Sequence, residues 1–178
     1  MVGAHSTKAV AAAAIAVVSL LMASPAGSTG SSPFQVVTSS GAMSDLSTST
    51  ADATDGARGV AISVGRTGRG TTVLLGLWGL STASAGTVYG AHVHVGPCVG
   101  GNGAAAGPHY NTTGGTTIDQ TTEVWLDFTA TARGTGFAAA TVPFVIPSGG
   151  ARSIVVHAMP TAPNGTAGAR LACLPLEY

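Results

Sequence analysis

Two histidines separated by one residue, His92 and His94, are the first side chains in the sequence that could do chemistry. They lie in the stretch Val88–Val95, whose composition is typical of a β-strand. Because side chains alternate between the two faces of a strand, both imidazoles would point to one face, where they could chelate a single metal ion. Taken alone the pattern is a weak indicator, since surface and core histidines account for most pairs of this kind.

Two further histidines lie later in the chain, His109 in a glycine- and proline-containing stretch and His157 at the end of the apolar run Ile154–His157. Either one by itself is more often a structural histidine than a metal ligand. A set of four imidazoles suits Zn, Cu, Fe or Ni, and an all-nitrogen tetragonal set favours Cu(II). The residues therefore predict a transition-metal site and leave the metal and its chemistry open.

The N-terminal segment, residues 1–26, has the three parts of a secretory signal peptide. Lys8 precedes an apolar run, and small residues follow at Ser24 and Ala26. The apolar run is shorter than the about 20 residues that a transmembrane helix needs. A retained anchor is the alternative. We expect a secreted or otherwise extracytoplasmic protein with no membrane span once the signal is removed.

The chain has two cysteines, Cys98 and Cys173. An even number of cysteines in an exported chain predicts one disulfide, which would restrict the unfolded state by closing a long loop. Two free, buried thiols are the alternative.

Short strands separated by glycine- and proline-containing turns must position these residues. Stretches 59–64 and 71–80 flank the turn Arg66–Gly70 and predict a hairpin. Segment 96–122 has little strand or helix character and contains Cys98 and His109, so we expect a tethered functional loop. Further strands are expected at 88–95, 123–131, 136–146, 152–157 and 169–174.

The pattern as a whole predicts an all-β fold, an antiparallel sandwich or barrel, because seven or so short strands occur and no helical periodicity extends beyond the signal. We place the domain at residues 58–178. Residues 27–57 read as a flexible Ser/Thr-rich leader with a short edge strand at Phe34–Val37.

The charge of the chain excludes several classes of function. It has 7 Lys+Arg and 7 Asp+Glu, and only 8% of its residues are charged. A nucleic-acid partner would require a basic face, and a disordered acidic tail would require an excess of acids. We therefore expect no nucleic-acid partner.

Four segments resemble those of copper/zinc superoxide dismutases, in the same order along the chain. Three of them are similar to the copper-site segments of that family, and the fourth is similar to its C-terminal segment with an active-site arginine and a disulfide cysteine. They are Gly90–His94, Ala106–Asn111, Val155–His157 and Ala167–Cys173. The resemblance implies a Greek-key antiparallel β-sandwich or flattened barrel of about eight strands with a long metal-site loop.

The resemblance also implies roles for individual residues. One copper ion per chain would be bound by His92, His94 and His157, with His109 as the fourth ligand and as a candidate for proton delivery. Arg170 would attract superoxide, and a Cys98–Cys173 disulfide would pin the loop to the barrel. The implied reaction converts superoxide to oxygen and hydrogen peroxide as copper alternates between Cu(II) and Cu(I).

The sequence departs from the two-metal pattern after His109. Residues 111–122 contain no histidine, so we expect no zinc site, and the chain looks most like copper-only members of the family. The aspartate that follows the last copper histidine in two-metal members is also missing. Glu123 or Asp127 could take its place by orienting His94 or His109, or both could be solvated strand residues.

Three functions are consistent with this sequence. The first is a copper-dependent superoxide dismutase acting as a monomer or homodimer. The second is an extracytoplasmic copper-binding or buffering protein without efficient turnover. The third is a sandwich kept for surface structure, which the retained histidines and Arg170 disfavour.

Overall fold

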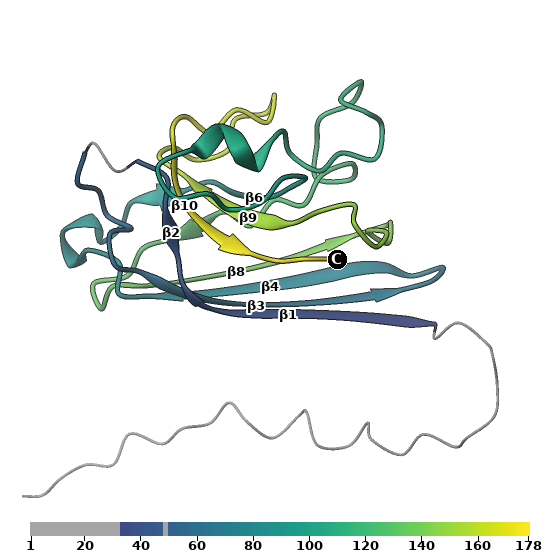
Figure 1. Ribbon diagram of the computed structural model, residues 1–178, viewed down its shortest axis with the longest axis horizontal. Coiled ribbons are helices and arrows are strands. Elements are labelled where there is room, and N and C mark those ends of the chain that lie inside the picture. The colour runs from purple at the N-terminus through teal and green to yellow at the C-terminus, as the bar shows by residue number, and fades with distance from the viewer. Residues whose placement is uncertain (1–32, 48–49) are drawn as a thin grey trace, which may run out of the picture. The chain divides into compact units, whose positions relative to one another are not determined.

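Two four-stranded antiparallel sheets form the framework of the computed structural model, which describes residues 33–47 and 50–178 (Figure 1). The first sheet has the order β1-β3-β4-β8, formed by Phe34–Ala42, Arg58–Arg66, Gly70–Trp78 and Thr135–Val142. The second has the order β2-β10-β9-β6, formed by Ser44–Asp45, Arg170–Pro175, Ser153–His157 and Ala91–His94. A small third sheet pairs β5 (Val88–Tyr89) with β7 (Phe128–Thr129). Two 3-10 turns, η1 (Thr82–Ser84) and η2 (Gly103–Ala106), complete the described elements.

The hydrophobic core lies between the two large sheets. Strand β3 alternates strictly, so that Ala61 is buried while Val60 and Ile62 face outward. From the second sheet Val93, Ile154 and Val156 join the same core. The all-β sandwich predicted from the strand pattern is confirmed, and no α-helix occurs among the described residues.

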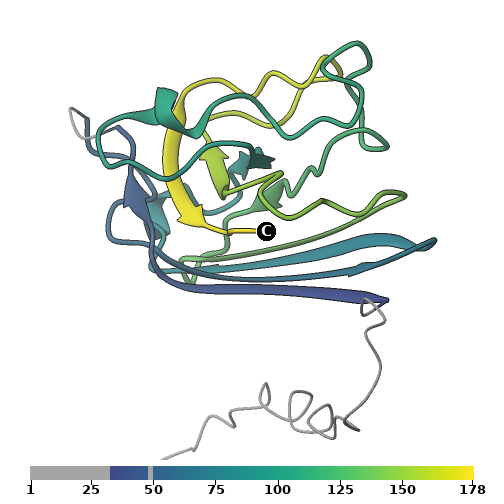
Figure 2. The same ribbon diagram turned by 45° about the vertical axis from the view of Figure 1, so that its right-hand side comes forward.

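The second sheet is covered on both faces. Every residue of β9 is buried, although only alternate residues can face the core. Val155 instead packs with Leu46, Ala106 and Cys173 in a separate small cluster on the outer face. Residues 96–122, called the covering loop below, contribute Cys98 and Ala106 to this cluster and so cover that face (Figure 2). His92 is opposite Val155 in the pairing of β6 with β9, so His92 and His94 point to the same outer face as Val155.

The predicted hairpin is confirmed, with β3 and β4 pairing from Arg58↔Trp78 to Arg66↔Gly70. The expected strand at 88–95 is divided at Gly90, where a Cβ would lie 2.8 Å from the Ala167 side chain. In the expected strand at 123–131 only β7 is regular. Isolated bridges at Glu123 and Trp125 connect the remainder to the loop and to β6.

The N-terminal part of the described chain differs from the expectation of a flexible leader at 27–57. The edge strand expected at Phe34–Val37 extends to Ala42, and β1 pairs with β3 along its whole length. Strand β2 then joins the second sheet beside β10. Placing the start of the fold near Arg58 was therefore wrong, because serine and threonine are favourable on the exposed face of a strand as well as in loops. The predicted signal, residues 1–26, lies outside the described residues.

A disulfide joins Cys98 to Cys173, with 5.6 Å between the Cα atoms, and so confirms the predicted bond. It ties the segment that covers the second sheet to β10. Among the described residues, no helix is long and apolar enough to span a bilayer.

The β3–β4 turn provides a test of this geometry. Gly68 and Gly70 both have positive φ, but only Gly70 faces backbone, with the Val142 carbonyl in the place of a Cβ. We expect Gly70→Ala to reduce the free energy of unfolding by more than about 3 kcal/mol. The matched Gly68→Ala variant, with open space around its Cβ, should cost only about 1 kcal/mol. Equal costs in urea unfolding would contradict the close packing of β4 on β8 at this turn.

Candidate metal centre

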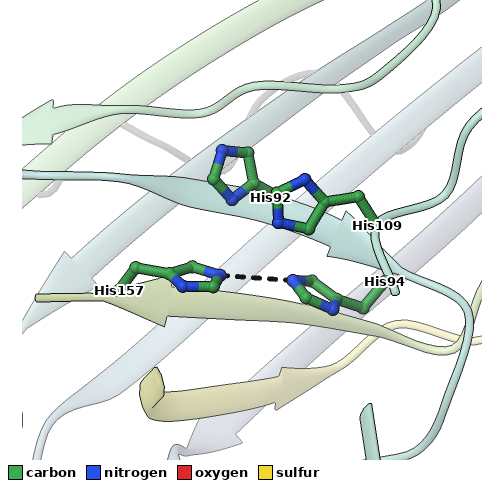
Figure 3. A group of neighbouring side chains, drawn as sticks. All are labelled: His92, His94, His109 and His157. Carbon is green, nitrogen blue, oxygen red and sulfur yellow. Dashed lines mark hydrogen bonds between the residues drawn. The ribbon is translucent and has the colours of Figure 1, made fainter. Parts of the chain in front are cut away.

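Four histidines converge on the outer face of the second sheet (Figure 3). His92 and His94 come from β6 and His157 from the end of β9, while His109 lies in the covering loop, bridged to His94. One nitrogen from each ring lies within 4.8 Å of those from the other three. His92, His94 and His157 are buried, and His109 is partly exposed. The structure thus brings together all four predicted ligands, which could hold a metal ion.

Backbone carbonyls set the orientation of two of these rings. His94 Nδ1 donates to the Gly107 carbonyl at 3.0 Å, and His157 Nδ1 donates to the Gly168 carbonyl at 3.3 Å. A neutral imidazole has one N–H, so in both rings Nε2 carries the lone pair. These two Nε2 atoms face each other at 3.3 Å.

The ring of His109 is set by a carboxylate. Its Nδ1 donates to Glu123 Oε2 at 2.8 Å, which again leaves Nε2 as the lone-pair atom toward the other histidines. Glu123 is buried, yet it also accepts from the Trp125 indole N–H at 2.9 Å and from the Asn111 amide at 3.0 Å. Three donors offset the loss of hydration of this buried carboxylate.

His92 is set by a two-residue relay. Asp127 accepts the hydroxyl hydrogen of Thr161, so the Thr161 oxygen is left to accept from His92 Nε2, at 2.8 Å. The Thr161 backbone N–H also donates to Asp127, at 2.8 Å. The lone pair of His92 therefore lies on Nδ1, a buried atom without a hydrogen-bond partner.

These four rings fit a metal ion. Each ring presents a lone pair inward and donates its N–H outward. The inward nitrogens therefore have no hydrogen to donate to one another. The buried His92 Nδ1 also has no other hydrogen-bond partner. Metal–nitrogen bonds of about 2.0–2.1 Å place neighbouring ligand nitrogens roughly 3–4 Å apart, which matches this spacing. A cation at the centre would accept the lone pairs of all four nitrogens.

Burial keeps three of these rings neutral. It lowers the pKa of His92 to about 2, of His94 to about 3 and of His157 to about 4, and the nearby His109 contributes in the same direction. The Gly107 and Gly168 carbonyls partly oppose the effect on the pKa values of His94 and His157. Neutral imidazole is the form that binds metals.

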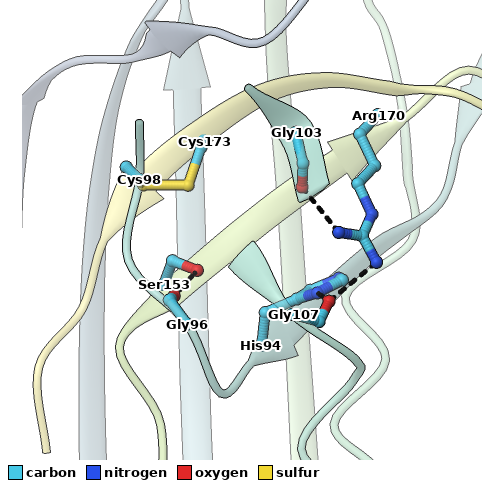
Figure 4. Close-up of a disulfide and its surroundings, with 8 residues drawn as sticks. All are labelled: His94, Gly96, Cys98, Gly103, Gly107, Ser153, Arg170 and Cys173. Atoms are coloured by element: carbon cyan, nitrogen blue, oxygen red, sulfur yellow. Dashed lines mark hydrogen bonds between the residues drawn. A yellow bond between two sulfur atoms is a disulfide. The ribbon is translucent and has the colours of Figure 1, made fainter. Parts of the chain in front are cut away.

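Arg170 lies beside the histidines and is held by the covering loop (Figure 4). Its guanidinium donates to the Gly103 carbonyl at 2.6 Å and to the Gly107 carbonyl at 2.7 Å. The Gly107 carbonyl thus accepts from both Arg170 and His94, which links the arginine to a metal-site ring. Cys173 follows three residues after Arg170 on β10, so the disulfide anchors the same loop to the same strand.

A cavity of about 790 Å³ opens beside the centre. His109, His157 and Arg170 line it, whereas His92 and His94 lie beneath the surface. Among the described residues that form the lining, Arg170 is the only cationic side chain and Glu123 is the only acidic one. An anion entering this cavity would meet one fixed positive charge next to two of the histidines.

The two acids considered at the sequence level are placed differently from each other. Glu123 contacts His109. Asp127 reaches neither His94 nor His109, and acts instead on His92 through Thr161. Sequence reasoning missed Thr161, Asn111 and Trp125, because their hydrogen bonds depend on loops that no local pattern describes. The only signal that could have found them was their position near the predicted metal-site segments.

Comparisons with known proteins bear on the fold. No family model matches the chain, and no curated protein matches it. Among solved structures, it is similar to the clock protein EA4, with a TM-score of 0.57 and 16% identity over 85% of this chain and 99% of that chain. It is also similar to a double mutant of a SOD-like protein from Bacillus subtilis, with a TM-score of 0.54 and 17% identity over 83% of this chain and all of that one. The chain thus shares the SOD-like β-sandwich fold.

The relay to His92 can be tested by substitution. Thr161→Val removes the acceptor for His92 Nε2–H, so the ring should lose its fixed orientation and Cu(II) affinity should fall by about 10- to 100-fold. Thr161→Ser keeps the hydroxyl and should bind copper like the wild type. Competition titration with a chelator measures both variants, and equal affinities for Val and Ser would show that the relay does not orient the ring.

The metal-free protein should lose stability in acid. The unfolded chain takes up protons at histidine near pH 6.5, whereas His92, His94 and His157 stay neutral in the folded state to about pH 4 or below. Stability is therefore fully present above pH 6.5 and falls as pH drops, by up to about 2 kcal/mol per histidine at pH 5. Urea unfolding at pH 7 and pH 5 measures this, and His92→Asn should flatten the dependence. An unchanged slope in that variant would contradict burial of a neutral His92.

Proposed function

We propose that this chain is an exported, copper-dependent superoxide dismutase that binds one copper ion and converts two superoxide anions and two protons to oxygen and hydrogen peroxide. The observation that carries the proposal is a four-imidazole site beside a cavity whose lining, among the described residues, contains a single arginine. The SOD-like fold agrees with it. The disulfide agrees with an oxidising compartment outside the cytoplasm.

The donor set favours copper. Four neutral nitrogen ligands without a carboxylate or thiolate suit Cu(II). His92 Nδ1 and the Nε2 atoms of the other three rings would hold the ion. Copper bound there would supply one-electron chemistry by alternating between Cu(II) and Cu(I). The two-metal arrangement is not required for orienting His109, because Glu123 already holds its Nδ1.

Arg170 would capture the substrate. Superoxide is a small anion, and the guanidinium is the one positive charge among the described residues that line the cavity. Two carbonyls hold the guanidinium beside the histidines, so it needs little rearrangement when an anion arrives. The only lysine of the chain, Lys8, lies in the predicted signal. Attraction of the anion would therefore depend on this arginine rather than on a ring of lysines.

His109 is placed to handle protons. Its Nε2 faces the centre, and the ring lines the cavity, so this atom, whenever it is not bound to the ion, could hold a proton and pass it to reduced dioxygen. Glu123 would stabilise the imidazolium formed in the process through the Nδ1–H bond at 2.8 Å. The carboxylate is in turn fixed by Trp125 and Asn111.

A copper-binding protein without efficient turnover is the second candidate. The two hydrogen bonds from Arg170 to Gly103 and Gly107 stabilise the covering loop, a role that a storage site could also use. The two roles of Arg170 can be separated by replacing it with lysine. Lysine keeps the positive charge that would attract superoxide, but it cannot reproduce the two hydrogen bonds of the guanidinium to Gly103 and Gly107.

The purified, oxidised chain should contain one copper and no zinc, and should consume superoxide rapidly in pulse radiolysis. His157→Ala should lower both copper content and turnover, because it removes a ligand. Arg170→Ala should keep its copper but lose about 10-fold or more in rate, and Arg170→Lys should recover part of it. Arg152→Ala, at an exposed arginine paired with Glu177, is the matched control and should behave as the wild type.

The outcomes separate the two candidates. Bound copper without turnover would favour the storage protein. A chain that binds no copper would refute both candidates, and full activity of His157→Ala would refute the site assignment.

A further inference from the structure

Two asparagines beside the metal-site cavity close turns of the same kind, at Asn111-Thr112-Thr113 and at Asn164-Gly165-Thr166. Asn111 Oδ1 accepts the Thr113 N–H at 2.8 Å, and Asn164 Oδ1 accepts the Thr166 N–H at 3.2 Å. In each turn the threonine hydroxyl donates to the same oxygen, at 2.7 Å. Because the two turns match, the remaining contacts of each asparagine can be compared directly.

The amide nitrogen distinguishes the two residues. Asn111 Nδ2 donates to the Thr117 carbonyl at 2.8 Å and to Glu123 Oε1 at 3.0 Å, so both of its hydrogens are used. Its Oδ1 also accepts the Gly115 N–H at 3.1 Å. Among the described residues, Asn164 Nδ2 has no such partner. The side chain of Asn111 thus connects the beginning, the middle and the end of residues 111–123, which we call the Asn111 loop.

The Asn111 loop depends on these polar contacts. None of residues 112–121 is buried, and the one large apolar side chain among them, Ile118, is 39% exposed. Hydrophobic packing therefore contributes little to its path. Residues 111–122 also contain no histidine and no cysteine, so imidazole or thiolate ligands cannot organise them around a metal ion. Asn111 alone makes five side-chain hydrogen bonds in this segment.

The contacts of Asn111 lead to the ring of His109. Asn111 Nδ2 and His109 Nδ1 donate to the two different oxygens of the Glu123 carboxylate. An isolated backbone bridge places Asn111 opposite Glu123. The Glu123 side chain is 5% exposed, so water cannot readily replace a lost donor. If the carboxylate turned away, His109 would lose the acceptor that sets its ring.

We propose that Asn111 is a positioning residue of the metal centre. Its carboxamide does for the Asn111 loop what a bound ion would do, by joining three parts of the loop at one point, and it fixes the carboxylate that orients His109. Asn111 acts through the loop and Glu123, without touching the histidines. The effect on catalysis rests on the proposed function, in which His109 delivers protons, whereas the effects on the loop and on the ring do not.

Two substitutions separate the two parts of this role. Asn111→Asp keeps an oxygen for the Thr113 and Gly115 N–H groups, and aspartate is favourable in such turns. It removes both N–H donors and places a second carboxylate against Glu123. Asn111→Ala removes all five hydrogen bonds.

NMR of the isotopically labelled, metal-free full chain measures both effects. In the wild type, the His109 Nδ1–H should give a downfield resonance because it donates to a carboxylate. Asn111→Asp should shift or abolish this resonance while the Thr113 and Gly115 amides stay protected from hydrogen exchange. Asn111→Ala should also make these amides exchange at least about 10-fold faster, the equivalent of one hydrogen bond. With copper bound, both variants should lose about 10-fold in superoxide turnover.

Asn164→Asp and Asn164→Ala are the matched controls. They alter the same kind of turn beside the same cavity and should leave the His109 resonance unchanged. The double variant Asn111→Asp/Glu123→Gln exchanges donor and acceptor: the new amide at position 123 can donate to the new carboxylate at position 111 and still accept from His109. It should move the resonance back toward the wild-type position. Thermal melting checks that every variant folds.

Three results would overturn the proposal. They are an unchanged His109 resonance in Asn111→Asp, unchanged amide exchange in Asn111→Ala, and a shift in the Asn164 variants as large as in the Asn111 variants. A copper-loaded wild type without turnover would refute the proposed function instead. The resonance and exchange data come from the metal-free protein, so they would still decide the role of Asn111.

Discussion

The structure depends on holding four imidazoles with their lone pairs directed at one another, three of them buried and neutral. Each of these inward nitrogens lacks a donor within the protein, so the arrangement is stable only if the other nitrogen of each ring is held from outside. Two carbonyls, one carboxylate and one threonine do this, and all of them come from segments other than the strands that carry the rings. A bound cation would remove the remaining electrostatic cost, so metal binding and folding of the covering loop should favour each other.

The covering loop connects β10 to the metal-site histidines. The disulfide, the Arg170 guanidinium and the Gly107 carbonyl connect it to β10 and to His94. The same contacts that bury the rings therefore also set the one positive charge beside the cavity. Arg170 is thus fixed beside the cavity by its position in the fold, although the chain has few charged residues. The opposite sheet, β1-β3-β4-β8, contributes none of the four histidines.

Much of the fold followed from the sequence, because strand alternation is a local property. The β3–β4 hairpin, the pairing of His92 with His94 on one face and the Cys98–Cys173 bond could all be predicted, since spacing and cysteine number are visible in the chain. The start of the fold was misplaced because the exposed residues of β1 have the composition of a loop. Gly90 divides the strand expected at 88–95, and a side chain there would collide with Ala167, which is far along the chain.

By itself, therefore, the sequence determined the chemical identity of the site: four imidazoles, one arginine, one cysteine pair and the strands that carry them. Only the tertiary structure decided which partner holds which ring. Asp127 lies 34 residues from Thr161, and Thr161 lies 69 residues from His92. No periodicity spans such separations, because side-chain hydrogen bonds between loops arise only once the sheets have packed and the loop has closed over them. The inward direction of every lone pair therefore depends on the folded chain, because the groups that orient the rings lie in segments distant in sequence.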